Sequence, residues 1–188
     1  ICYMFSDLNS YTQYYGMNNG PFVNQGFNPN NLNNGFDFRT TGMTGFNNDE
    51  LISFSQAVDM IRRSVGDERA DEVFYDALIK MAPNDRDKEI ITGIRDDERK
   101  HNRILRELYF NFTGQMIPGD TSNEACENNF TYKEGLEKAL FGELEAVVKY
   151  RRIMGVMSSG NSYILVMSIM TDELRHSAMY NYLIHMAK

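Results

Sequence analysis

Cysteine is scarce in this 188-residue sequence, which contains only Cys2 and Cys126. The two lie far apart, so the chain lacks the Cys-x-x-Cys pair that could hold zinc, a rubredoxin-type iron or a thioredoxin-type redox centre. A disulfide framework normally needs more cysteines, so we interpret them as two separate thiols in a reducing cytosol. An inter-chain disulfide through Cys2 or Cys126 is the alternative.

Positive charge and long apolar runs are also lacking. The sequence has 19 basic and 26 acidic residues, for a net charge of −7. It shows no cluster of basic residues of the kind that binds nucleic acids or anionic membranes. No apolar run approaches the ~18–20 residues that span a bilayer, and no basic stretch precedes an apolar one near the start. We expect no nucleic acid and no membrane as partners, and a cytoplasmic location. An extracellular or spore-coat-associated assembly is the alternative.

The composition divides the chain into two regions. Residues 1–49 are dominated by Asn, Gly, Tyr and Phe and show no helical periodicity, so they predict an extended low-complexity arm. From residue 50 to 188 the sequence is rich in Ile, Leu, Val, Met and charged residues, with apolar positions recurring at helical spacing. This second region predicts the packed domain.

Four long helices are predicted in the second region, at 53–82, 85–112, 131–158 and 161–187. The breaks at Pro83-Asn84 and at 158–161 are short, as between antiparallel neighbours. The intervening 113–130 segment is long enough, at about 60 Å when extended, to run beside a helix of about 42 Å. The fold class is therefore all-α: a four-helix bundle of two antiparallel hairpins joined by a long crossover.

The two hairpins repeat one pattern at a distance of 75 residues. The shift places Glu68 on Glu143, Tyr75 on Tyr150, Asp97 on Asp172, Glu98 on Glu173 and His101 on His176. Apolar positions follow the same shift, so core and polar residues repeat together. Within the first hairpin, Pro83 is the midpoint between the two glutamates, which places them at the same height.

Four glutamates interrupt the apolar stripes of the four helices, and two histidines lie one turn further on the same faces. Four buried carboxylates would repel one another strongly unless protons or cations compensate them. Two divalent ions match this charge. Mixed carboxylate and imidazole donors suit iron best and manganese next, and zinc also accepts them. The predicted ligands are Glu68, Glu98, His101, Glu143, Glu173 and His176.

This pattern resembles the rubrerythrin-type branch of the ferritin-like superfamily from about residue 50 onward. The resemblance rests on Gly-Asp-Glu68 with Tyr75, Asp97-Glu98-Arg-Lys-His101, Leu108-Tyr109-Phe-Asn-Phe-Thr-Gly114, Glu143 with Tyr150, and Asp172-Glu173-Leu-Arg-His176. It implies a ferritin-like bundle in which Glu98 and Glu173 bridge two metals. Glu68 and Glu143 would be terminal carboxylates and the histidines terminal imidazoles. Tyr75 and Tyr150 would surround the ligands without touching the metals.

Two departures from the family pattern affect the expected chemistry. The four cysteines of a rubredoxin domain are missing, and Ala146 replaces an extra family glutamate one turn after Glu143. Glu72, one turn after Glu68, is a candidate extra ligand. We expect a redox enzyme that reacts with hydrogen peroxide or dioxygen, as a peroxidase with an external electron donor, a ferroxidase or a catalase. The alternative is a homo-oligomeric structural subunit of a coat, shell or filament, assembled through the 1–49 arm.

Overall fold

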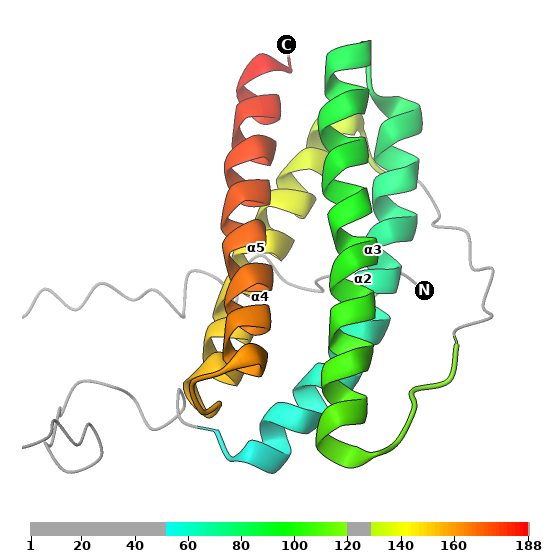
Figure 1. The fold of residues 1–188 in the computed structure, drawn as a ribbon. Coiled ribbons are helices and arrows are strands. Elements are labelled where there is room, and N and C mark those ends of the chain that lie inside the picture. Colours follow the sequence, from blue (N-terminus) through cyan, green and yellow to red (C-terminus); the bar gives the residue numbers. More distant parts are fainter. Residues whose placement is uncertain (1–51, 120–128, 188) are drawn as a thin grey trace, which may run out of the picture. The chain divides into compact units, whose positions relative to one another are not determined.

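The computed structural model describes residues 52–119 and 129–187, which form four α-helices and no strand. The helices are α2 (Phe54–Met81), α3 (Asp85–Thr113), α4 (Tyr132–Gly155) and α5 (Asn161–Met186) (Figure 1). The prediction of four helices is confirmed, although α4 ends three residues before its predicted boundary. The predicted arm, Cys2 and Cys126 lie outside the described residues.

Local sequence explains where the helices begin and end. Ser53 and Thr131 start α2 and α4 with capping boxes. In each, the N-cap hydroxyl accepts a hydrogen bond from the backbone N–H of residue N3, and the N3 side chain accepts one from the backbone N–H of the N-cap residue. Asn84 caps α3 by accepting a hydrogen bond from the Asp87 amide. Gly114 closes α3 at φ 69°, a left-handed conformation that glycine adopts without a steric penalty.

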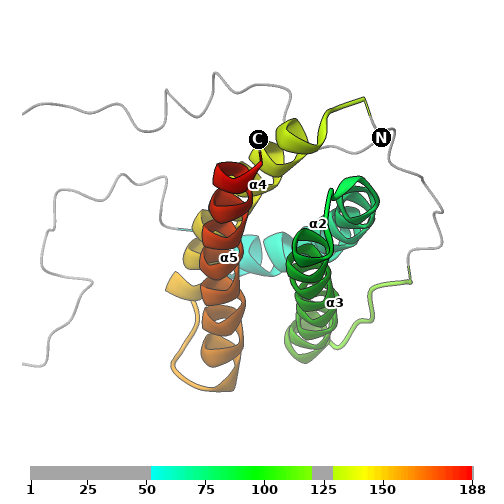
Figure 2. The ribbon, with the colours of Figure 1, turned by 90° about the horizontal axis from the view of Figure 1, so that it is seen from above.

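The helices pair as two hairpins, α2 with α3 and α4 with α5 (Figures 1 and 2). Between the hairpins, α2 contacts α4 and α3 contacts α5. The end of α3 and the start of α4 lie at opposite ends of the bundle (Figure 1). In the described part of the chain, no helix is long and apolar enough to cross a membrane.

The core consists of two apolar layers. One layer lies towards the α2–α3 turn and includes Phe74, Leu78, Ile94, Leu136 and Leu183. The other lies towards the opposite end and includes Ile61, Val65, Leu105, Ile153 and Ile169. In each helix the predicted glutamate falls in sequence between the residues of the two layers, so the polar groups form a middle layer enclosed by apolar packing.

Candidate metal centre

The six predicted ligands meet in this middle layer, one glutamate from each helix and one histidine each from α3 and α5. The four glutamates are each 2% exposed and the two histidines are fully buried. Ionised groups are rarely buried this completely without charge compensation. The Glu-x-x-His spacing on α3 and α5 brings each histidine onto the face of its own glutamate, since residues three apart are neighbours on a helix.

The six residues form two overlapping groups of four donors. Glu68, Glu98, His101 and Glu173 make up one group, and Glu98, Glu143, Glu173 and His176 make up the other. Within each group, one donor atom per residue lies within 4.8 Å of the others. The site can therefore hold metal ions, and Glu98 and Glu173 belong to both groups.

His101 directs its two ring nitrogens to different partners. Its Nδ1 faces the cluster, 3.2 Å from Glu98 Oε2, 3.3 Å from Glu173 Oε1 and 3.8 Å from Glu68 Oε2. Its Nε2 lies 3.3 Å from Asp172 Oδ2, across the hairpin interface. A neutral imidazole carries one ring hydrogen, and in the tautomer that carries it on Nε2 this hydrogen is donated to Asp172 Oδ2. Its Nδ1 is then left with a lone pair for a metal.

His176 repeats this arrangement. Its Nδ1 lies 3.1 Å from Glu98 Oε1 and 3.5 Å from Glu143 Oε2, while its Nε2 lies 3.4 Å from Asp97 Oδ2. Burial raises the pKa of Asp97, but hydrogen bonds from Arg175 and His176 outweigh it, and the net pKa is lowered. Arg175 also contacts Asp97 directly, at 2.6 Å. The Asp97 carboxylate therefore stays ionised and fixes the imidazole orientation.

The roles of Asp97 and Asp172 were missed by the sequence analysis, although the signal was present. Each precedes a glutamate of the cluster, and the 75-residue shift superimposes them. Helical periodicity places them beside the inward face but does not reveal that each reaches the histidine of the other hairpin. Outer carboxylates of this kind fix the histidine tautomer and raise its basicity as a ligand.

Tyr75 and Tyr150 also reach across the hairpin interface. The Tyr75 hydroxyl donates a 2.7 Å hydrogen bond to Glu143 Oε1, and the Tyr150 hydroxyl donates one to Glu68 Oε1. Both rings are buried. Each tyrosine thus orients one carboxylate outside the shared pair and leaves the second carboxylate oxygen for other contacts.

Several cluster atoms are buried without a hydrogen-bond partner in the described structure. They are Glu68 Oε2, Glu98 Oε1, Glu173 Oε1 and His176 Nδ1. A buried polar atom without a partner costs about 1–3 kcal/mol, and native proteins keep few of them. Four such atoms in one cluster, all of metal-ligating types, fit a site built for cations.

Without a metal, the cluster must share protons. Burial raises the pKa of Glu98, and the neighbouring Glu173 and Glu68 raise it further. Burial likewise raises the pKa of Glu143. For His176, burial opposes the charged form, but the neighbouring carboxylates of Glu143, Glu173 and Glu98 outweigh this and raise its pKa. Metal ions would replace these protons on binding.

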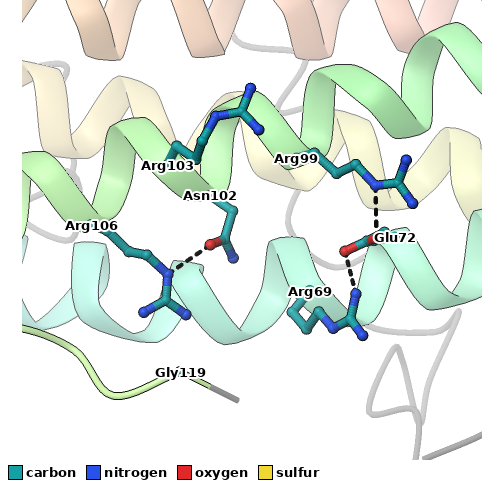
Figure 3. Close-up of a pocket in the computed structure, with 7 residues that line it drawn as sticks. All are labelled: Arg69, Glu72, Arg99, Asn102, Arg103, Arg106 and Gly119. Carbon is teal, nitrogen blue, oxygen red and sulfur yellow. Dashed lines mark hydrogen bonds and ion pairs between the residues drawn. The ribbon is translucent and has the colours of Figure 1, made fainter. Parts of the chain in front are cut away.

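Glu72, the candidate extra ligand, lies outside both donor groups. Its Oε1 accepts a 2.7 Å hydrogen bond from Arg99 Nε, and its Oε2 accepts one from Arg69 (Figure 3). Burial raises the pKa of Glu72, but these two hydrogen bonds outweigh it and lower the net pKa. Ala146 packs at the edge of the apolar layer that contains Ile61.

Comparisons with known proteins identify an uncharacterized relative, which indicates no activity for this chain. No protein-family model matches the chain, and no solved structure matches it. The chain is 33% identical over 109 residues to the uncharacterized protein YhjR of Bacillus subtilis. The match covers 57% of this chain and 72% of YhjR.

Proposed function

We propose that this chain, which belongs to the same family as the uncharacterized protein YhjR of Bacillus subtilis, is a ferritin-like di-metal redox protein that reacts with hydrogen peroxide or dioxygen. The observation that carries the proposal is the pair of overlapping donor groups that share Glu98 and Glu173. Two carboxylates common to two groups are the arrangement needed to hold two ions at bridging distance.

The donor set narrows the choice of metal. Four carboxylates and two imidazoles suit iron or manganese, and their charge of −4 balances two divalent ions. Glu68 with His101 would complete one metal position, and Glu143 with His176 the other. The bound metals would supply the redox chemistry, while the chain supplies buried ligands held by hydrogen bonds from neighbouring side chains.

The three reactions proposed for the site differ in where their electrons come from. These 188 residues contain only two cysteines, so the four cysteines of an iron centre that serves as an internal donor do not lie among them. We therefore consider three sources of electrons: an external reductant, Fe(II) itself, or a second peroxide molecule. These sources correspond to a peroxidase, a ferroxidase and a catalase respectively.

The test combines metal stoichiometry with turnover. We expect the full chain loaded with Fe(II) or Mn(II) to bind two ions per chain and to consume hydrogen peroxide. Dependence on a reductant would identify a peroxidase, and oxygen release without a reductant a catalase. Glu98→Gln should lose both ions, because Glu98 belongs to both groups. Glu72→Gln, the matched control one turn from a ligand, should keep two.

Absence of stoichiometric metal after loading with either ion would refute the metal centre. Equal loss of metal from the Glu98 and Glu72 variants would also refute the assignment of the ligands. Two bound ions without turnover of peroxide or dioxygen would leave a metal protein but contradict the redox proposal.

A second candidate function, a structural subunit, is favoured by the outer face of α5. That helix contains only three charged residues besides histidine, Asp172, Glu173 and Arg175, and all three belong to the cluster or its carboxylate support. Five of its exposed side chains are large and apolar, with 39–56% exposure: Ile164, Met167, Leu174, Tyr182 and Met186. Arg175, Asn181 and His185 are exposed on the same helix. Apolar stripes of this kind mark interaction surfaces.

We assign a second copy of the chain to this surface. An antiparallel twofold pairing of α5 centred near Leu174 would place Met167 opposite Tyr182 and the small Thr171 opposite Ala178. The spacing is therefore self-complementary, as a twofold interface requires. The five apolar side chains expose on the order of 500 Å² per copy, so two copies reach about 1,000 Å², the lower bound for a specific interface.

Light scattering tests this surface. We expect the full chain to be dimeric or larger, and Leu174→Glu to shift it to monomer, because the substitution removes an apolar side chain from the centre of the contact and places a charge there. Met116→Glu changes a methionine that is 82% exposed in the connection after α3 and should leave the assembly unchanged. A monomeric parent chain, or an unchanged Leu174 variant, would contradict the assignment.

A further inference from the structure

A cavity of about 380 Å³ lies on the outer side of the α2–α3 hairpin, next to the start of the connection that follows α3 (Figure 3). Its lining consists mainly of arginines from the two helices: Arg69, Glu72, Arg99, Asn102, Arg103, Arg106 and Gly119. We call it the arginine pocket. It is separate from the buried metal cluster, which lies on the inner faces of the same helices.

The charge of the arginine pocket is opposite to that of the chain. Four arginines against one glutamate give its lining a charge of +4 − 1 = +3, whereas the whole chain carries −7. Guanidinium groups of like charge repel one another, so gathering four of them is unfavourable without an anion. One internal carboxylate compensates only part of this charge.

Glu72 compensates the part of the pocket formed by Arg69 and Arg99. Its two oxygens each accept a hydrogen bond from one of these guanidinium groups, at 2.7 Å for Arg99 Nε. Arg99 also contacts Asp96 Oδ1 at 3.0 Å. These contacts hold the two arginines in place and leave further N–H groups on each of them unused.

Arg106 and Arg103 have no carboxylate partner in the described structure. Arg106 is held by neutral acceptors, with its Nε 2.8 Å from Asn102 Oδ1 and its Nη1 2.9 Å from the Ile117 carbonyl oxygen. These bonds fix its position without neutralising its charge. For Arg103, no hydrogen bond or ion pair is found within residues 52–119 and 129–187. Among residues 52–119 and 129–187, two of the four positive charges therefore have no carboxylate partner.

The internal repeat shows that the bundle does not need these arginines. The 75-residue shift places Arg69, Arg99, Arg103 and Arg106 on Leu144, Leu174, Ala178 and Asn181, and Glu72 on Val147. The second hairpin thus forms the same helix pair without a single charge at these five positions. The arginines belong to the first hairpin alone, which points to a role other than folding.

We propose that the arginine pocket binds a phosphate-bearing anion. Guanidinium groups pair with phosphate oxygens through two parallel hydrogen bonds, and Arg106 is already oriented by neutral partners. The volume lies in the range of small-molecule sites and exceeds what one phosphate group fills. Pyrophosphate or a phosphorylated small molecule fits the charge and the space better than orthophosphate does.

The experiment uses the metal-free full chain, so that pyrophosphate cannot act by removing metal. Thermal unfolding and calorimetric titration would be followed with pyrophosphate, orthophosphate, ATP and sulfate at constant ionic strength. We expect saturable stabilisation, strongest with pyrophosphate or ATP. Arg106→Gln and Arg103→Gln should each weaken binding about tenfold or more, in line with the loss of a charged hydrogen bond. Stronger binding of ATP than of pyrophosphate would identify a nucleotide as the source.

The matched control is Arg62→Gln. Arg62 lies on α2 outside the pocket, with Nη2 3.1 Å from Asp59, and its loss should leave the titration unchanged. The Arg103 variant guards against misfolding, because that side chain makes no hydrogen bond or ion pair to the described residues. Equal weakening by Arg62→Gln, an equal response to sulfate, or no saturable response would overturn the proposal. Loss of metal binding would not affect this outcome, so the two proposals fail separately.

Discussion

Tyr75 on α2 donates a 2.7 Å hydrogen bond to Glu143 on α4, so a tyrosine of one hairpin orients a carboxylate of the other. The reciprocal bond joins Tyr150 to Glu68. Both bonds are buried, and each uses only one oxygen of its carboxylate. The tyrosines therefore couple the packing of the two hairpins to the geometry of the cluster.

Replacing Tyr75 with phenylalanine should weaken both stability and metal binding. The change leaves Glu143 Oε1 buried without its donor, which should cost about 1–3 kcal/mol in the free energy of unfolding. Loss of an outer hydrogen bond to a ligand should lower metal affinity roughly 10- to 100-fold. Urea unfolding and competition with a chelator measure the two effects. Tyr182→Phe, a partly exposed tyrosine on α5, should change neither.

Asp172→Asn should affect the metal position that includes His101 more than the other. Asparagine can present its NH₂ group to His101 Nε2, which would favour the wrong tautomer and remove the Nδ1 lone pair. We expect a roughly 10- to 100-fold loss of affinity for one ion of the two. Sequential metal titration would resolve it. If both ions weaken equally, the assignment of Asp172 to His101 alone is wrong.

The metal-free protein should become less stable as pH rises. Burial raises the pKa of Glu98 and Glu143 above the ordinary 4.5, so the folded state holds these protons more tightly than the unfolded state. Their contribution is complete below that value and is lost as pH rises through the raised pKa. The raised pKa of His176 acts in the same direction. Glu173, whose pKa is lowered although burial opposes this, acts oppositely at more acidic pH.

Metal loading should reverse this trend, because metal ions replace the shared protons and bind more tightly as pH rises. Melting temperatures of the metal-free and loaded chain between about pH 5 and pH 8 would test both directions. The difference between the two curves should widen with pH. Parallel curves would show that the cluster titrates independently of metal.

Gly135→Ala should destabilise the contact between the two hairpins. A Cβ atom at Gly135 would lie 2.5 Å from Leu78 Cδ2 and 2.8 Å from Phe130 Cε2. Both distances are shorter than van der Waals contact, so the Leu78 and Phe130 side chains or the helix would have to move. Overpacking of this kind costs about 1–3 kcal/mol in the free energy of unfolding. Gly66→Ala, in an open position on α2, should instead stabilise by roughly 0.5–1 kcal/mol. Urea unfolding compares them, and equal effects would contradict the close approach.

The sequence alone determined the helices and the inward position of the six predicted ligands. Apolar residues at helical spacing mark the buried stripe of each helix, so a glutamate within that stripe must face the core. The repeat then placed the glutamates at one height. Their meeting in one buried cluster is observed, and metal ligation stays a prediction.

Only the tertiary structure decided which partners the neighbouring residues take. Helical periodicity gives the direction of a side chain but not the identity of the helix that it meets. For that reason the sequence did not predict that four side chains contact the opposite hairpin, namely those of Asp97, Asp172, Tyr75 and Tyr150. The same limit applies to Glu72, which lies near the boundary of the inner face. Its carboxylate pairs with Arg69 on its own helix and with Arg99, which the packing of α2 on α3 brings alongside, and it lies outside the cluster of predicted ligands.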